Sequence, residues 1–302
     1  MSMADGREAK PRVGGQSEVT PLRRVLVKHP QDAFHSYLAI TEQWERLGYL
    51  RRPELDKAID EFDLFMGLLE SLGARIEFLP PHPETSLDSL YVRDASIVTN
   101  RGVILCNMGK EARAAEPRAQ AEAFEALGIP VLGQISGKGR VEGGDFVWLD
   151  EGTAVVGRGY RTNDEGIRQL KGLLAETAKE LIVVPLPHWR GPGDVFHLMS
   201  VLSPIDRDLA LVYSPLLPVP FREHLQSKGI RLVEVPGPEF ETMACNVLAL
   251  APRLCVMLEG NPVTQWRLEE AGVKVRLYQG NEISIPGAGG PTCLTRPLLR
   301  EG

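Results

Sequence analysis

The feature that most constrains the fold is a repeated order of predicted elements along the chain. Over residues 96–135, two short β-rich runs around a polar turn are followed by a helical pattern and then by a third β-rich run. The same order recurs over residues 145–187, 200–236 and 246–280. A unit of this size cannot bury its own apolar face, so neighbouring units have to pack against one another.

A fifth unit is divided between the two ends of the chain. Residues 23–30 and 53–80 supply a strand, a helix and a second strand, and residues 292–299 supply one more strand. We therefore predict an α/β fold in which five ββαβ units form a ring, a five-bladed β/α propeller with its helices outside. The alternative is a doubly wound parallel sheet, but the polar turns "TNRG" and "LDEG" favour antiparallel pairs.

Two segments lie outside the repeated units. Residues 29–52 do not fit the pattern and are predicted to place a loop and a helix over one mouth of the ring. The first residues are polar, so we expect a flexible N-terminal arm over residues 1–20 and a single propeller domain over residues 21–302. Asn163 or Asp164 is expected to cap the helix of the second unit.

Composition argues against two classes of partner. The chain has 302 residues and a formal net charge of −6 at pH 7, whereas nucleic acids and anionic membranes both select a basic face. No stretch reaches the roughly 18 apolar residues of a membrane span, and the N-terminus lacks the apolar core of a secretory signal. We expect a cytoplasmic protein that acts on a small molecule, without a nucleic-acid or membrane partner, and we leave a homodimer open.

The cysteines give no sign of disulfides or of a structural metal site. There are four, widely spaced, with no CxxC pair and no nearby histidine cluster of the kind that zinc sites use. In a reducing compartment each is by default a small buried hydrophobe. Cys293 stands apart from Cys106, Cys245 and Cys255 because it follows the glycine-rich stretch "GAGGPT".

Four polar stretches fall where one unit passes into the next. They contain Asp94 in "LYVRD", Glu142 in "RVEGGDF", His197 in "GDVFHLMS" and Cys293 in "GAGGPTCLT". In a ring, equivalent positions of successive units converge near the axis, so these four side chains are predicted to meet. Each alone has a purely structural interpretation: a salt bridge, a bend, a core histidine or a buried thiol. Together, a thiol, a histidine and a carboxylate are the parts of nucleophilic catalysis.

In this order, the four motifs resemble those of the guanidine-modifying enzyme superfamily. Its members are five-bladed β/α propellers that include arginine deiminase, dimethylarginine dimethylaminohydrolase and the arginine amidinotransferases. The resemblance covers nearly the whole chain, from "LRRVLVKHP" to "TCLTRPLL". It implies that Cys293 is the nucleophile, that His197 is the general acid and base, and that Glu142 is the carboxylate paired with this histidine. Asp94 is implied to anchor the guanidinium group of the substrate.

The same resemblance implies two arginines that hold the carboxylate of the substrate. They are Arg161 in "GRGYRTN" and Arg113 in "GKEARAAEP", and a guanidinium group binds a carboxylate bidentately. The implied reaction begins with attack of Cys293 on the guanidino carbon and protonation of the departing amine by His197. Water then hydrolyses an S-alkylthiouronium intermediate to a ureido product such as citrulline. No metal and no organic cofactor is expected.

Two further positions bear on the choice of substrate. Arginine deiminases and amidinotransferases typically have an aspartate where this chain has Met199, whereas the dimethylarginine hydrolases lack it. We expect Met199 to form an apolar wall beside the leaving nitrogen, which favours an N-alkylated guanidine. Arg93, also counted as a substrate-binding residue, is instead typical of arginine deiminases.

These comparisons predict a hydrolase similar to dimethylarginine dimethylaminohydrolase, with an arginine deiminase or an amidinotransferase as alternatives. The chain lacks the arginine that deiminases tend to carry shortly before the cysteine, and Thr292 stands where amidinotransferases tend to have histidine. A different class of function is a catalytically silent propeller that binds an arginine-like ligand. The set of Cys293, His197 and Glu142 argues against it, because a binding protein has no use for a nucleophile.

Overall fold

Five three-stranded sheets make up the fold, as the sequence predicts. The computed structural model describes residues 13–194 and 196–301, and its sheets have the strand orders β15-β1-β2, β3-β4-β5, β6-β7-β8, β9-β10-β11 and β12-β13-β14. The strands are β1 (Leu22–Val27), β2 (Arg75–Phe78), β3 (Ser96–Thr99), β4 (Gly102–Leu105), β5 (Val131–Gln134), β6 (Phe146–Trp148), β7 (Thr153–Arg158), β8 (Glu180–Pro185), β9 (Leu202–Asp206), β10 (Leu209–Val212), β11 (Arg231–Glu234), β12 (Leu248–Ala251), β13 (Leu254–Leu258), β14 (Lys274–Tyr278) and β15 (Arg296–Arg300).

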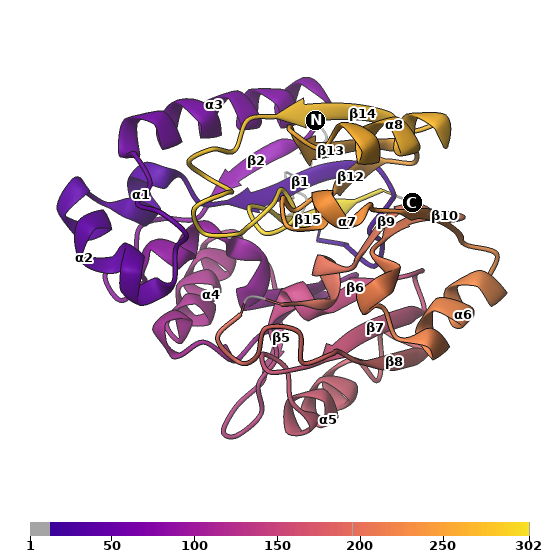
Figure 1. Cartoon of the computed structure of the whole chain (residues 1–302). Helices are drawn as coiled ribbons and strands as arrows, with labels where there is room; N and C mark the ends of the chain where they lie inside the picture. Colours follow the sequence, from indigo (N-terminus) through magenta and orange to yellow (C-terminus); the bar gives the residue numbers. More distant parts are fainter. Residues whose placement is uncertain (1–12, 195, 302) are drawn as a thin grey trace, which may run out of the picture.

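Each sheet has the same internal topology. The first two strands form an antiparallel pair, and the third runs parallel to the second after a helical crossover. Figure 1 shows these crossover helices at the outside of the molecule. The helices are α1 (Pro30–Phe34), α2 (Tyr37–Leu47), α3 (Leu55–Ser71), α4 (Glu116–Ala126), α5 (Asp164–Leu173), α6 (Val219–Ser227), α7 (Gly237–Phe240) and α8 (Pro262–Glu270), with the short 3-10 helices η1 (Leu87–Leu90), η2 (Val92–Ala95), η3 (Glu111–Arg113), η4 (Gly143–Asp145), η5 (Leu198–Ser200) and η6 (Ser214–Leu216).

Local sequence signals explain where the helices start. The side chain of Asn163 accepts a hydrogen bond from the backbone N–H of Gly166 at 2.9 Å, so Asn163 is the cap and Asp164 is the first helical residue of α5. Apolar side chains of α5, among them Leu170, are buried in the cluster between this helix and its sheet. Proline at the first turn of α4, α6 and α8 fits the same rule, since no backbone donor is lost there.

Neighbouring sheets are joined in chain order around the ring. The indole Nε1 of Trp148 in β6 donates to the carbonyl of Val98 in β3 at 3.0 Å. The side chain of Ser203 in β9 donates to the carbonyl of Cys245, just before β12, at 2.7 Å. Strand β12 also contacts β1, and β15 contacts β3. Five buried apolar clusters fill the space between sheets and helices.

The two ends of the chain meet in one sheet, as predicted for the divided unit. Strand β1 pairs antiparallel with β15 on one side and parallel with β2 on the other. Leu298 in β15 is fully buried and packs with residues of β1 and β3. This pairing closes the ring with the last strand of the chain.

The segment before β1 differs from the predicted free arm where the structure describes it. Residues 1–12 lie outside the described residues. Gly14 pairs with Leu299 beside β15, and the backbone N–H of Arg300 donates to the Gly14 carbonyl at 2.7 Å. Glu18 forms an ion pair of 2.7 Å with Arg93. Residues 14–20 are therefore packed against the propeller rather than free of it.

The segment that did not fit the repeat covers one mouth of the ring, as expected. It forms α1 and α2, and the end of α2 is held by the ammonium of Lys110, which donates to the Leu47 carbonyl at 2.6 Å. The N–H of Leu50 donates to the Pro286 carbonyl at 2.7 Å. Within residues 13–194 and 196–301, no helix combines the length and the apolar character needed to cross a bilayer.

The closing strand should carry much of the stability of the ring. We expect Leu298→Ala to lower the free energy of unfolding by about 2–5 kcal/mol, because it removes a fully buried side chain and leaves a cavity. Urea denaturation followed by circular dichroism measures this change. Leu64→Ala, at an exposed position of α3, is the matched control and should change stability by less than about 0.5 kcal/mol. Equal effects of the two substitutions would contradict the role of β15.

Candidate active site

The predicted site residues occupy equivalent positions in different sheets. Asp94 lies in η2 ahead of β3, Glu142 precedes η4 and β6, and His197 precedes η5 and β9. Cys293 lies in the turn ahead of β15. Asp94, His197 and Cys293 line one cavity of about 100 Å³, and Glu142 lies directly behind the histidine. The structure thus brings together the four side chains that the ring was predicted to bring together.

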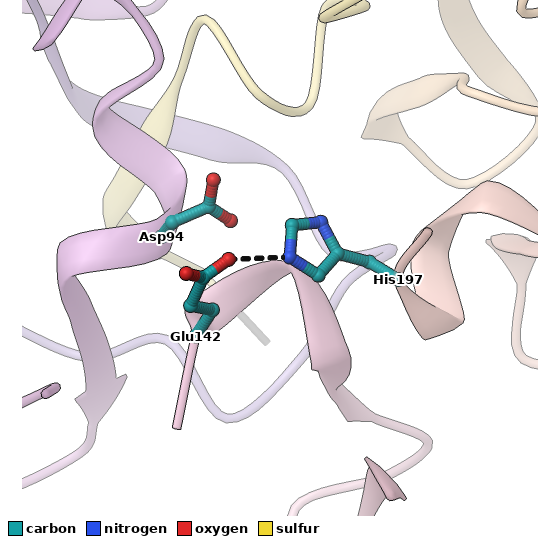
Figure 2. A group of neighbouring side chains, drawn as sticks. All are labelled: Asp94, Glu142 and His197. Atoms are coloured by element: carbon teal, nitrogen blue, oxygen red, sulfur yellow. Dashed lines mark hydrogen bonds and ion pairs between the residues drawn. The ribbon is translucent and has the colours of Figure 1, made fainter. Parts of the chain in front are cut away.

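Glu142 and His197 form a buried pair. His197 Nε2 lies 2.7 Å from Glu142 Oε2, and neither side chain is more than 5% exposed. Figure 2 shows this contact and the carboxylate of Asp94 beside it. Because a carboxylate only accepts hydrogen bonds, Nε2 carries the hydrogen of this bond. Gly144 permits the approach, since a Cβ there would lie 2.6 Å from His197 Nδ1 and 2.8 Å from Asp94 Oδ1.

The histidine is held in its charged form by its neighbours. Burial alone would lower the pKa of His197, but the carboxylates of Asp94, Asp145 and Glu142 outweigh it and raise this pKa to about 9. For Glu142, burial favours the neutral form, yet the bond to His197 and the charge of Arg161 bring its pKa below the usual range. At neutral pH the pair is therefore an imidazolium and a carboxylate.

Asp94 is equally constrained. Its Oδ1 accepts from the backbone N–H of Gly144 at 2.9 Å, and its Oδ2 accepts from the Arg113 guanidinium at 2.5 Å. Burial opposes its ionisation, but the charges of His197 and Arg113 outweigh burial and lower the pKa of Asp94. A fixed, ionised carboxylate at the cavity wall is suited to a cationic ligand.

Cys293 contacts Asn246, which lies in the segment ahead of β12. The Nδ2 of Asn246 donates to the sulfur at 3.4 Å, and the hydroxyl of Thr292 lies 3.9 Å from it. Burial and the charge of Asp94 raise the pKa of the thiol, while these two contacts oppose the rise. The other cysteines, Cys106, Cys245 and Cys255, are buried in the core.

The two arginines predicted to hold a substrate carboxylate reach the cavity but are already paired with protein carboxylates. Arg161 donates from one amino group to both oxygens of Glu142, at 3.0 and 3.2 Å. Arg113 binds Asp94, both oxygens of Glu116 and the Tyr91 carbonyl. Buried carboxylates need such partners, because an uncompensated buried charge is strongly destabilising. Among the described residues, Arg161 keeps most of its donors without a partner, whereas Arg113 does not.

Arg93 and Met199 do not line the cavity, which corrects their predicted place at the substrate. In a 3-10 helix successive side chains point about 120° apart, so Arg93 turns away from Asp94 and pairs with Glu18 at 2.7 Å. Met199 lies in η5 and is only 3% exposed, packed in the apolar cluster formed with Leu198 and its neighbours. The apolar wall expected from Met199 is therefore not at the cavity.

Several residues that line the cavity were not predicted from the sequence. Lys110 and Asp88 form an ion pair of 2.6 Å at the wall, and Asp88 stands only six residues before Asp94. The glycine run packs on the ring of Tyr91, where a Cβ at Gly287 or Gly289 would overlap the aromatic atoms. The wall is completed by residues 47–50 and by Gly193, Asp194 and Ala288.

The described residues also contain a cluster of potential metal ligands and a second, larger cavity. Oxygen and nitrogen atoms of Asp94, Glu142 and His197 lie within 4.8 Å of one another, as metal ligands would, but Nε2 of the histidine is bonded to Glu142. A larger cavity of about 730 Å³ opens at the opposite mouth, among hairpin turns that include Asn100, Asp150 and Arg207. The lining of this larger cavity contains no cysteine, whereas the smaller cavity contains Cys293. The smaller cavity is therefore the better candidate for the active site.

Comparison with known proteins identifies a matching family model and relatives of the chain. The family model described as "Arginine deiminase" matches residues 78–219 and 216–300. An N(G),N(G)-dimethylarginine dimethylaminohydrolase of Pseudomonas aeruginosa is 26% identical over 76% of this chain and 84% of that protein. An arginine deiminase of Mycobacterium avium is 27% identical over 70% of the chain, which spans only 60% of that longer protein.

The solved structures agree on the fold. The dimethylarginine dimethylaminohydrolase of Pseudomonas aeruginosa, as a cysteine-to-serine mutant complexed with citrulline, superimposes with a TM-score of 0.72. The match covers 93% of this chain and all of that one, at 23% identity. The propeller fold of this chain is therefore shared with that enzyme.

The charge state of the histidine is open to direct test. We expect the His197 ring to titrate near pH 9 in a two-dimensional NMR spectrum, and Asp94→Asn to lower that pKa because it removes a charge that favours the imidazolium. With a folded-state pKa above the unfolded value of about 6.5, the stabilisation is complete below pH 6.5 and is lost as the pH rises through 9. Asp63→Asn, at an exposed position on α3, is the control. A wild-type ring that titrates at or below pH 6.5 would contradict the charged pair.

Proposed function

The chain belongs to the arginine deiminase family, and from this premise we propose that it is a cysteine-dependent hydrolase of the guanidino carbon of arginine or N-methylated arginine. The relatives named dimethylarginine dimethylaminohydrolase and arginine deiminase support hydrolysis of a guanidino C–N bond. The proposed products are a ureido compound such as citrulline and an amine or ammonia.

One observation carries the proposal. A thiol, a charged histidine and a fixed aspartate line one cavity, with Glu142 bonded to the histidine at 2.7 Å. A planar cation pressed between Asp94 and Cys293 would present its carbon to the sulfur. Cys106, Cys245 and Cys255 are buried, whereas Cys293 is partly exposed and lines this cavity.

The proposed reaction follows from these charge states. A guanidinium bound to Asp94 stabilises the Cys293 thiolate, whose proton passes to solvent. The sulfur attacks the guanidino carbon, the C–N bond breaks, and the imidazolium of His197 gives its proton to the departing amine. The neutral histidine then takes one proton from water, whose oxygen attacks the S-alkylthiouronium carbon. The C–S bond breaks to release the thiolate, and the remaining hydroxyl proton passes to solvent to leave the ureido product. Glu142 holds the ring in place through both steps.

Arg161 and Arg113 take different roles in this proposal. Arg161 uses one amino group for Glu142 and keeps the other donors of its guanidinium for a substrate carboxylate. Arg113 has committed nearly all its donors to Asp94, Glu116 and the Tyr91 carbonyl. We therefore assign it to the orientation of Asp94 rather than to a second contact with substrate.

A dimethylated substrate is placed first for two reasons. Position 199 supplies no carboxylate, so nothing there requires two unsubstituted amino groups, although Met199 itself does not line the cavity. The chain also spans 84% of the dimethylarginine hydrolase but only 60% of the arginine deiminase. Arginine deimination is the second candidate, supported by 27% identity to that enzyme against 26% to the dimethylarginine hydrolase.

A product assay tests the activity. We expect purified protein to release citrulline and dimethylamine from asymmetric dimethylarginine, with slower release of citrulline and ammonia from arginine. Cys293→Ser, which removes the nucleophile, should lower the rate by at least about a hundred-fold. Rates should not change after treatment with a chelator. Citrulline from arginine alone would favour the deiminase alternative, and no turnover of either substrate would reject both.

The buried position of Met199 makes a separate prediction about specificity. Met199→Leu conserves volume within the core, so we expect the ratio of kcat/KM for dimethylarginine and arginine to stay within about two-fold of wild type. Steady-state kinetics with both substrates measures the ratio. A large shift would mean that this side chain reaches the leaving nitrogen after all.

A further inference from the structure

Four of the five units supply a proposed active-site residue from the same position, ahead of the first strand. These are Asp94, Glu142, His197 and Cys293. In the remaining unit this position, between α7 and β12, is held by Asn246. The asparagine is only 9% exposed and lies beside the cysteine. The fourth unit therefore also contributes a polar side chain to the mouth of the ring.

The contacts of Asn246 fix the direction of its amide. Its Oδ1 accepts from both the backbone N–H and the hydroxyl of Thr292, at 3.1 and 2.8 Å. Two donors on this oxygen leave the amino group Nδ2 facing the sulfur of Cys293, at 3.4 Å. The hydrogen-bond network therefore fixes the orientation of the amide. Thr292 thus orients the amide of Asn246, and the amide directs an N–H toward the thiol.

The glycine before this turn is part of the same construction. A Cβ on Gly290 would lie 2.5 Å from Oδ1 and Cγ of Asn246. That is closer than real Cβ contacts, so only glycine allows the chain to pass the amide at this point. The glycine run before Cys293 is therefore matched to the asparagine that the sulfur contacts.

The charges that face Cys293 do not favour a thiolate by themselves. Asp94 lines the same cavity, and its negative charge opposes a negative sulfur. Tyr91 and Tyr278 also pack toward it and bear no positive charge. The cations that line the cavity are each paired with a protein carboxylate: His197 and Arg161 with Glu142, Lys110 with Asp88, and Arg113 with Asp94. In such a site, a neutral hydrogen-bond donor directed at the sulfur can stabilise the thiolate.

We propose that Asn246, oriented by Thr292, positions the Cys293 sulfur and stabilises it as a thiolate through the Nδ2–H···S hydrogen bond. This inference rests on the proposed role of Cys293 as nucleophile. With Asn246 from the fourth unit, each of the five units contributes one side chain to the site. It also gives Thr292, at the place where related amidinotransferases tend to have histidine, a role in this site.

The test is the pH dependence of Cys293 alkylation by iodoacetamide, followed by mass spectrometry of the intact protein and of its peptides. Cys293→Ser gives the background from the three buried cysteines. For Asn246→Ala and Asn246→Asp we expect the apparent pKa of the thiol to rise by about one unit, which is a ten-fold smaller thiolate fraction at neutral pH. Asn281→Ala, at an exposed asparagine, is the matched control and should leave the profile unchanged.

A second pair of variants separates this role from folding. Thr292→Val removes the hydroxyl that orients the amide, and Thr292→Ser restores it, so the profile should shift in the first variant and recover in the second. Thermal melting of each variant reports on folding. An unchanged thiol pKa in folded Asn246→Ala and Thr292→Val would overturn the proposal and leave Asn246 a structural role only.

The outcome does not depend on turnover. If the alkylation profiles shift as expected while no guanidine is hydrolysed, the thiolate inference stands and the proposed activity fails. If citrulline forms but the profiles of the variants match wild type, the activity stands and the inference about Asn246 fails.

Discussion

The pairing of the first strand with the last is the constraint on which the remaining structure depends. Strand β1 lies between β2 and β15, so one sheet is complete only when the C-terminus returns to the N-terminus. Cys293 stands three residues before β15. Ring closure therefore also delivers the sulfur to the mouth where the first strands of the other sheets begin. Packing and the proposed chemistry depend on the same pairing.

Charge balance is the second constraint on the site. Asp94, Glu142 and Glu116 are nearly inaccessible to water, and each binds an arginine or a histidine. Breaking such a pair leaves a buried uncompensated charge, which costs several kcal/mol. This explains why Arg113 and Arg161 face protein carboxylates instead of pointing freely into the cavity. An added guanidinium can bind without disrupting these pairs, because a carboxylate oxygen accepts more than one hydrogen bond.

The repeat made the architecture and the convergence of Asp94, Glu142 and His197 predictable, because equivalent positions in a ring meet near its axis. Side-chain direction was not predictable in the same way. Arg93 lies in the same 3-10 helix as Asp94, yet its side chain pairs with Glu18. The side chain of Met199 packs in the apolar core. Asn246 escaped attention because an amide is not a residue type that suggests catalysis by itself. Its partner is 47 residues away in sequence, so only the fold shows the contact.

The size of the cavity constrains how a substrate reaches this site. A space of about 100 Å³ is smaller than the 300–1,000 Å³ typical of ligand pockets. Its cover comes from residues 47–50 and from the glycine-rich turn, which are tied together by the bond from Leu50 N–H to the Pro286 carbonyl. An arginine-sized molecule under the proposed function is larger than this space, so its binding requires these segments to shift. Because the turn continues directly into Thr292 and Cys293, its closure on a substrate would also set the position of the sulfur, which couples substrate enclosure to the geometry of attack.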